Sequence, residues 1–167
     1  MKYIKLFEKF EDWNTLSAKD FAEVRELNRI GVVSDQELAE LKKLRRIEKK
    51  ILQYTGVGDL DLRECDLLKS LPAGLKVGGN LSLYRCTGLQ SLPAGLKVAG
   101  YLSLYDCTGL ESLPAGLEVE NDLDLTGCTS LKSLPAGLKV GRNIYLRGSN
   151  ILGELPQGLN VVGQIYK

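Results

Sequence analysis

The side chains best suited to chemistry are the cysteines, and their spacing is unusual. They lie 21 residues apart, at Cys65, Cys86, Cys107 and Cys128. Zinc sites place cysteines roughly two to four residues apart, so this spacing does not predict a metal site. The chain contains no histidine, which removes the commonest metal ligand and the usual general base. We therefore predict a structural ladder of thiols, with Ser149 in the fifth place, and expect no metal, cofactor or catalysis.

Disulfide bonds are the other use for cysteines that stack about one strand spacing, ~4.8 Å, apart. The opening residues 1–10 contain basic residues but no long apolar stretch, so they do not resemble a secretory signal. We accordingly expect a cytoplasmic protein, in which thiols stay reduced. The cysteines are then predicted to be free.

Two further features suggest phosphate binding but have simpler explanations. The basic run at residues 42–50 is placed opposite the apolar face of a predicted helix, as on any solvated helix. Glycine pairs such as Gly78-Gly79 lack the lysine and the strand-to-helix context of nucleotide-binding loops, so we interpret them as turns. The net charge is only +1. We expect neither nucleic acid nor a membrane as partner.

The cysteines belong to a repeat of 21 residues that organises most of the chain. Five blocks follow one another without insertion, and a sixth begins at Ile165; they start at Leu60, Leu81, Leu102, Leu123 and Ile144. All five prolines share one repeat position, at Pro72, Pro93, Pro114, Pro135 and Pro156. A repeat of this length indicates a solenoid, in which each coil buries its apolar side chains against its neighbours.

The alternation of apolar and polar residues at the start of each block predicts a half-buried strand. We expect these strands in one parallel sheet, near residues 60–63, 81–84, 102–105, 123–126 and 144–146. Proline bars a helix from the turn that follows, and 21 residues leave little room for a full convex helix. The segment Gly74-Leu75-Lys76-Val77 and its copies leave a second short strand open, which would give a two-sheeted β-solenoid.

The motif Leu-x-Leu-x-x-Cys-x-x-Leu-x-x-Leu-Pro resembles the leucine-rich repeat over residues 57–167. Its short length and its Leu-Pro step are most similar to the repeats of bacterial secreted effectors. The resemblance implies a parallel-sheet stack of five to six coils, a helical cap before the repeats, and a role in binding proteins. The fold class that we predict is therefore an α/β solenoid of the leucine-rich-repeat type.

Residues 1–56 are predicted to form a helical cap domain ahead of the solenoid at 57–167. Apolar residues recur at helical spacing over residues 17–30, which Gly31 would end. Ser34 and Glu37 then form a capping-box pattern before a second helix that is predicted to reach about Tyr54. We expect a helical hairpin that covers the first coil.

The candidate functional surface is the exposed, concave face of the predicted sheet. The repeat register aligns aromatic and basic side chains there: Tyr84, Tyr101, Tyr105, Tyr145, Arg63, Arg85 and Arg147. Tyrosine and arginine are enriched among residues that dominate binding energy. We therefore predict a non-catalytic module that binds a protein of unknown identity, although tyrosine also suits strands for purely structural reasons.

An alternative function is a structural or assembly element of a phage or bacterium. The last block diverges most from the others, and residues 165–167 begin a strand that no polar capping coil follows. An uncovered strand edge is a template for another chain. We accordingly expect a possible homodimer through the C-terminal edge, since two-fold dimers are the commonest oligomers.

Overall fold

The computed structural model describes residues 26, 29, 31, 34–151 and 155–167. The chain divides into two compact units, Met1–Glu48 and Lys49–Lys167. Most of the predicted first helix, residues 17–30, lies outside the described residues. Its described members Glu26 and Arg29 are both helical and form an ion pair of 2.5 Å, and Gly31 has a φ of 74°. The predicted helical hairpin is therefore not shown, and one helix, α3, is described.

Helix α3 spans Asp35–Gln53 and begins with the predicted capping box. The backbone N–H of Glu37 donates to Ser34 Oγ at 3.3 Å, and the N–H of Ser34 donates to Glu37 Oε2. The two side chains thus satisfy backbone donors that the first turn leaves without helical partners. Apolar residues on one side of the helix are buried, namely Leu38, Leu41, Leu44 and Ile47.

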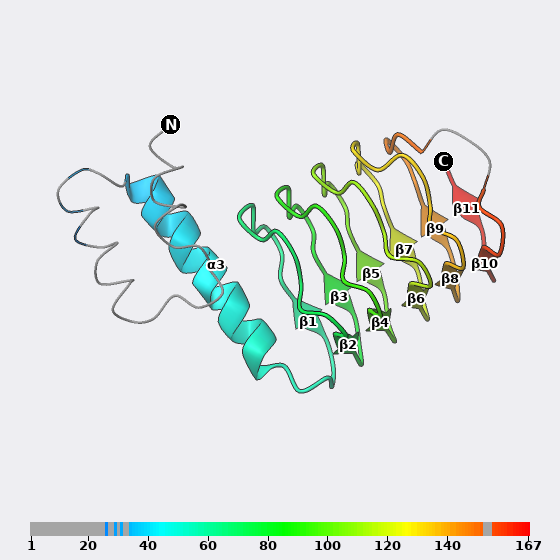
Figure 1. Ribbon diagram of the computed structural model, residues 1–167, viewed down its shortest axis with the longest axis horizontal. Helices are drawn as coiled ribbons and strands as arrows, with labels where there is room; N and C mark the ends of the chain where they lie inside the picture. The colour runs from blue at the N-terminus through cyan, green and yellow to red at the C-terminus, as the bar shows by residue number, and fades with distance from the viewer. Residues whose placement is uncertain (1–25, 27–28, 30, 32–33, 152–154) are drawn as a thin grey trace. The chain divides into compact units, whose positions relative to one another are not determined.

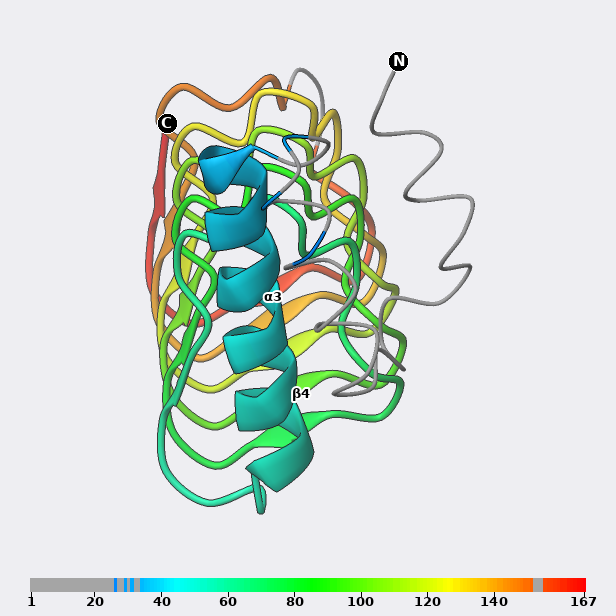
Figure 2. The same cartoon turned by 90° about the vertical axis from the view of Figure 1, so that its left-hand side faces the viewer.

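The solenoid is built from two parallel sheets (Figure 1). The six-stranded sheet contains β1 (Leu60–Asp61), β3 (Leu81–Ser82), β5 (Leu102–Ser103), β7 (Leu123–Asp124), β9 (Ile144–Tyr145) and β11 (Ile165–Tyr166). The five-stranded sheet contains β2 (Lys76–Val77), β4 (Lys97–Val98), β6 (Glu118–Val119), β8 (Lys139–Val140) and β10 (Asn160–Val161). Figure 2 shows successive coils overlying one another along the stack. The second strand that the sequence left open is present, so each complete coil contributes one strand to each sheet.

The strand register follows the repeat. Leu60 pairs with Leu81, and Leu81 with Leu102, so partners are 21 residues apart as predicted. The strands are two residues long, shorter than the predicted three or four. Backbone hydrogen bonds between coils nevertheless continue beyond them, from Leu62 N to Ser82 O at 2.9 Å and from Glu64 N to Tyr84 O at 2.7 Å.

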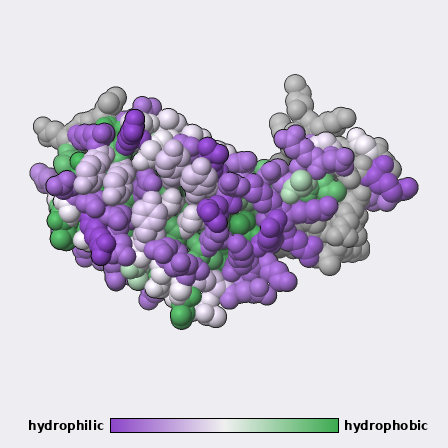
Figure 3. All heavy atoms as spheres, turned by 180° about the vertical axis from the view of Figure 1, so that it is seen from behind, coloured by the Kyte–Doolittle hydropathy of each residue, from purple (hydrophilic) through white to green (hydrophobic). Residues whose placement is uncertain are grey.

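The core is a stack of identical layers. The inward leucines of successive coils, such as Leu83 and Leu104, are fully buried. The four cysteines are buried and free, as predicted, and three of their thiols donate to carbonyl oxygens of the preceding coil. These contacts join Cys86 to Leu62 at 3.2 Å, Cys107 to Leu83 at 3.0 Å and Cys128 to Leu104 at 3.1 Å. Polar side chains cover much of the solenoid surface seen in Figure 3.

One position of each coil requires left-handed backbone. Glu64, Arg85 and Asp106 occupy it in the first three coils, with φ between 55° and 58°. Gly127 and Gly148 occupy it in the next two, with φ of 74° and 70°. This conformation costs a residue with a Cβ about 1–2 kcal/mol of conformational free energy, whereas glycine adopts it without that cost. The first three coils therefore carry charged side chains where glycine would fit the backbone better.

We expect Leu83→Ala and Leu104→Ala each to lower the free energy of unfolding by roughly 2–5 kcal/mol, because each empties a central layer. Lys97→Ala, on an exposed side chain, should change it by less than about 0.5 kcal/mol. Urea unfolding of the three variants measures the difference. Equal losses for all three would contradict the inward and outward assignments.

We expect Glu64→Gly to raise the free energy of unfolding by roughly 0.5–1 kcal/mol, because relief at the left-handed position exceeds the added freedom of the unfolded chain. Gly148→Ala should lower it by about 1 kcal/mol. A Cβ at Gly148 would make only ordinary van der Waals contacts with Gly127, at 3.8 Å and 3.9 Å. The loss of stability in this variant would therefore measure backbone strain and not a steric clash. Urea unfolding measures both changes, and a loss of stability in the Glu64 variant would refute the assignment of strain.

Candidate binding faces

The structure brings two of the predicted tyrosines together on the outward side of the six-stranded sheet. Tyr84 and Tyr105 follow β3 and β5, and their rings stack with centroids 5.3 Å apart and planes 22° apart. Both side chains are half-buried. Because the strands are in register, equivalent side chains of neighbouring coils necessarily meet. The pair is a rigid aromatic surface of the kind found at interfaces.

Arg85 extends this aromatic pair with a charge. Its guanidinium carbon lies 5.1 Å from the centroid of the Tyr84 ring, and its Nε lies 3.5 Å from Asp106 Oδ2. The first contact has the distance of a cation–π interaction. Arg85 and Asp106 both occupy the left-handed position, so the strained backbone is what places these charges beside the rings.

Tyr101 departs from the pattern of its column. In other coils an Asp or Asn here accepts a hydrogen bond from the next coil: Asp59 Oδ1 from Asn80 N at 2.7 Å, and Asp122 Oδ1 from Asn143 N at 2.8 Å. Tyr101 has no such oxygen, and its hydroxyl instead donates to Asp124 Oδ2 at 2.8 Å. Burial, followed by the hydrogen bond to Asp124, raises the pKa of Tyr101 well above its usual value.

The remaining predicted residues are distributed along the sheet. Tyr145 stacks on Tyr166, with ring centroids 5.1 Å apart and planes 8° apart. Arg63 pairs with Asp61 at 2.9 Å, while Arg147 is exposed beyond β9. Tyr166 was not among the predicted site residues, although the 21-residue register placed it one coil after Tyr145. Of the predicted tyrosines, Tyr84 and Tyr105 thus stack on each other, Tyr145 stacks on Tyr166, and Tyr101 binds Asp124.

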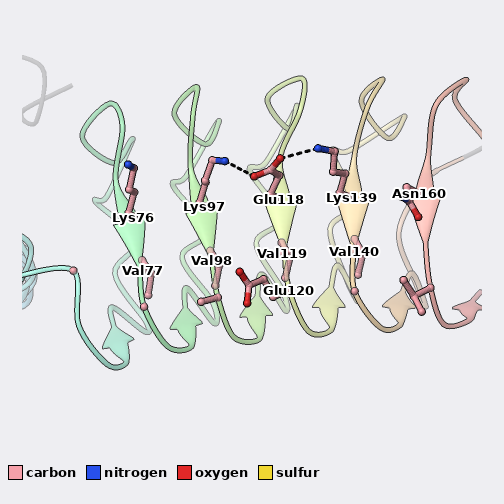
Figure 4. A pocket seen from close by; sticks show the side chains of 15 residues that line it. Lys76, Val77, Lys97, Val98, Glu118, Val119, Glu120, Lys139, Val140 and Asn160 are labelled. Carbon is pink, nitrogen blue, oxygen red and sulfur yellow. Dashed lines mark hydrogen bonds and ion pairs between the residues drawn. The ribbon is translucent and has the colours of Figure 1, made fainter.

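A second candidate surface was not predicted. A shallow groove of about 460 Å³ runs along the outward side of the five-stranded sheet (Figure 4). Glu118 lies between Lys97 and Lys139, at 2.5 Å and 2.9 Å from their ammonium groups. Hydrogen bonds from Lys97 and then Lys139 lower the pKa of Glu118 to about 2. The 21-residue spacing of these residues could have indicated this groove from the sequence. That inference would have required knowing that the second strand of each coil forms.

The described residues provide no sign of metal or thiol chemistry. They contain no group of three or more metal-binding side chains. Burial raises the pKa of Cys128 to about 12, and raises that of Cys107 as well, so these thiols stay protonated at neutral pH. Within the described part of the chain, no helix has the length and apolar character needed to cross a membrane.

These observations define a class of architecture, a parallel β-solenoid of about five coils with two sheets. Comparison of the chain with protein-family models, with curated proteins and with solved structures gave no match.

We expect Tyr101→Phe to lower the free energy of unfolding by about 1 kcal/mol at neutral pH, the typical contribution of one hydrogen bond. The pKa of Tyr101 is higher in the folded protein than in the unfolded chain, where it is about 10. The protonated Tyr101 side chain therefore contributes its full stabilisation of the fold at pH values below about 10. The difference between wild type and variant should therefore shrink as the pH rises above about 10. Urea unfolding from pH 7 to 11 measures it, and a difference that grows with pH would contradict the assignment.

Proposed function

We propose that this protein is a non-catalytic binding module whose partner docks on the outward side of the six-stranded sheet. The observation that carries the proposal is the Tyr84–Tyr105 stack with Arg85 over one ring. Such side chains present large, rigid contact area with polar tips and lose little conformational entropy on binding. The resemblance to bacterial leucine-rich repeats, whose strand face binds proteins, supports the same conclusion.

The size of the face limits the binding mode. Six strands at about 4.8 Å spacing give a sheet about 25 Å tall, which at a width near 20 Å is of order 500 Å². A standard interface buries roughly 800 Å² on each partner. The sheet alone thus suits a short segment or a weak contact.

The proposal predicts that Tyr84→Ala with Tyr105→Ala weakens partner binding by at least about tenfold while the fold persists. Immobilised wild-type protein would be used to retain partners from a lysate of its own cells, and the retained partner would then be titrated against each variant. Lys97→Ala with Lys139→Ala, on the five-stranded sheet, is the matched control. Unchanged affinity in the folded tyrosine variant, or an equal loss in the control, would place the site elsewhere.

An assembly element that self-associates through the edge formed by β10 and β11 is the second candidate. Side chains of the last described coil are more exposed than their equivalents: Leu155 is 45% exposed, whereas Leu134 is 5% exposed. Val162, at 78%, and Tyr166, at 45%, are also exposed there. In this alternative a second copy covers these side chains.

The alternative predicts a dimer in sedimentation-velocity experiments, which Val162→Lys converts to a monomer without loss of fold. Lys76→Ala, in β2 at the opposite end of the five-stranded sheet, should leave the dimer intact. A monomer at concentrations near 1 mM, which corresponds to a dissociation free energy below about 4 kcal/mol, would refute self-association.

A further inference from the structure

Charged side chains are unevenly divided between the outward side of the six-stranded sheet and the rest of the solenoid. We define the strand segments as residues 59–64, 80–85, 101–106, 122–127 and 143–148, which form the outward side of the six-stranded sheet with its flanks. They carry six acidic residues and three arginines, hence a charge of −3, and no lysine; the acidic residues are Asp59, Asp61, Glu64, Asp106, Asp122 and Asp124. The other residues of 57–167 carry seven basic and five acidic groups, hence +2.

Three of these six acidic residues lie beside Tyr101 and Tyr105. Asp124 accepts the Tyr101 hydroxyl at 2.8 Å, Asp122 lies one residue before β7, and Asp106 follows Tyr105 directly. Burial, then the hydrogen bond to Asp124 and the charges of Asp124 and Asp122, raise the pKa of Tyr101. The two carboxylates contribute to this shift because nearby negative charge disfavours a further anion.

Arg85 shows how a cationic side chain from a partner would bind to this surface. The Arg85 guanidinium lies over the Tyr84 ring at 5.1 Å and beside Asp106 at 3.5 Å. An aromatic ring next to a carboxylate stabilises a cation through both the ring quadrupole and the charge. Tyr101 and Tyr105, with Asp106, Asp122 and Asp124, repeat this combination of groups over the next two coils.

We propose, resting on the function proposed above, that the partner docks a basic, extended segment of polypeptide on the strand segments. Its lysine or arginine side chains lie between the tyrosine rings and the carboxylates. A face about 25 Å tall matches roughly seven residues of extended chain. Charge complementarity selects this occupant, because an acidic segment would meet a net negative charge on the same face.

The test uses the full chain and two synthetic probes, N-acetylated heptalysine amide and heptaglutamate amide. Titration is followed by amide chemical shifts in two-dimensional NMR at low ionic strength. We expect heptalysine to shift the amides of residues 80–85, 101–106 and 122–127, and to bind more weakly as salt is added. Heptaglutamate should leave these amides unchanged.

Asp106→Gly with Asp124→Asn should weaken heptalysine binding by at least about fourfold, since each exposed charge pair contributes roughly twofold or more. Asp106→Gly also relieves a left-handed residue, and Asn retains an oxygen that can accept the Thr126 N–H, so the fold should persist. Glu111→Gln with Glu120→Gln removes the same charge elsewhere on the solenoid and should change affinity by less than about twofold.

The outcomes separate this inference from the proposed function. Equal weakening in both double variants, or binding of heptaglutamate to the strand segments, overturns the basic partner. If heptalysine fails to bind but the tyrosine double variant still loses the cellular partner, the proposed function stands and the inference about its chemistry fails. If neither heptalysine nor the cellular partner depends on the strand segments, both fail.

Discussion

Every feature of this solenoid depends on one constraint, which is that a coil of 21 residues cannot bury its own leucines. An isolated coil would leave the side chains of Leu81 and Leu83 in water, so the free energy of burial is gained only when coils stack. Stacking in turn requires identical register. The pairing of Leu60 with Leu81 and of Leu81 with Leu102 satisfies that requirement without insertion.

Stacking also explains how the chain satisfies polar groups away from its strands. Buried thiols donate to carbonyl oxygens of the preceding coil, and Asp or Asn side chains accept backbone N–H groups of the following coil. These ladders supply partners that two-residue strands alone would not. Tyr101 interrupts one ladder, and Arg85 and Asp106 occupy backbone better suited to glycine. Two of the three left-handed residues other than glycine, Arg85 and Asp106, thus lie in the coils that carry the Tyr84–Tyr105 stack.

The two outward faces differ in chemistry although they share one repeat. The five-stranded sheet presents three lysines and one glutamate, and Glu118 pairs with two of the lysines, Lys97 and Lys139. The six-stranded sheet presents stacked aromatic rings among aspartates and arginines. Aromatic area and charge complementarity contribute to recognition in different ways, the first to affinity and the second to specificity and rate of association.

The sequence by itself determined the repeat, the inward and outward residues, the register, the capping box at Ser34 and the buried free cysteines. Each of these follows from local periodicity or from a short motif. It left open whether the segment around Val77 forms a strand, and it did not predict the groove beside Glu118. It aligned the tyrosines along one sheet but did not predict which rings stack, namely Tyr84 on Tyr105 and Tyr145 on Tyr166. Tertiary structure decided these points, because a two-residue strand exists only through its neighbours in other coils, and a ring stacks only where the adjacent coil supplies another ring.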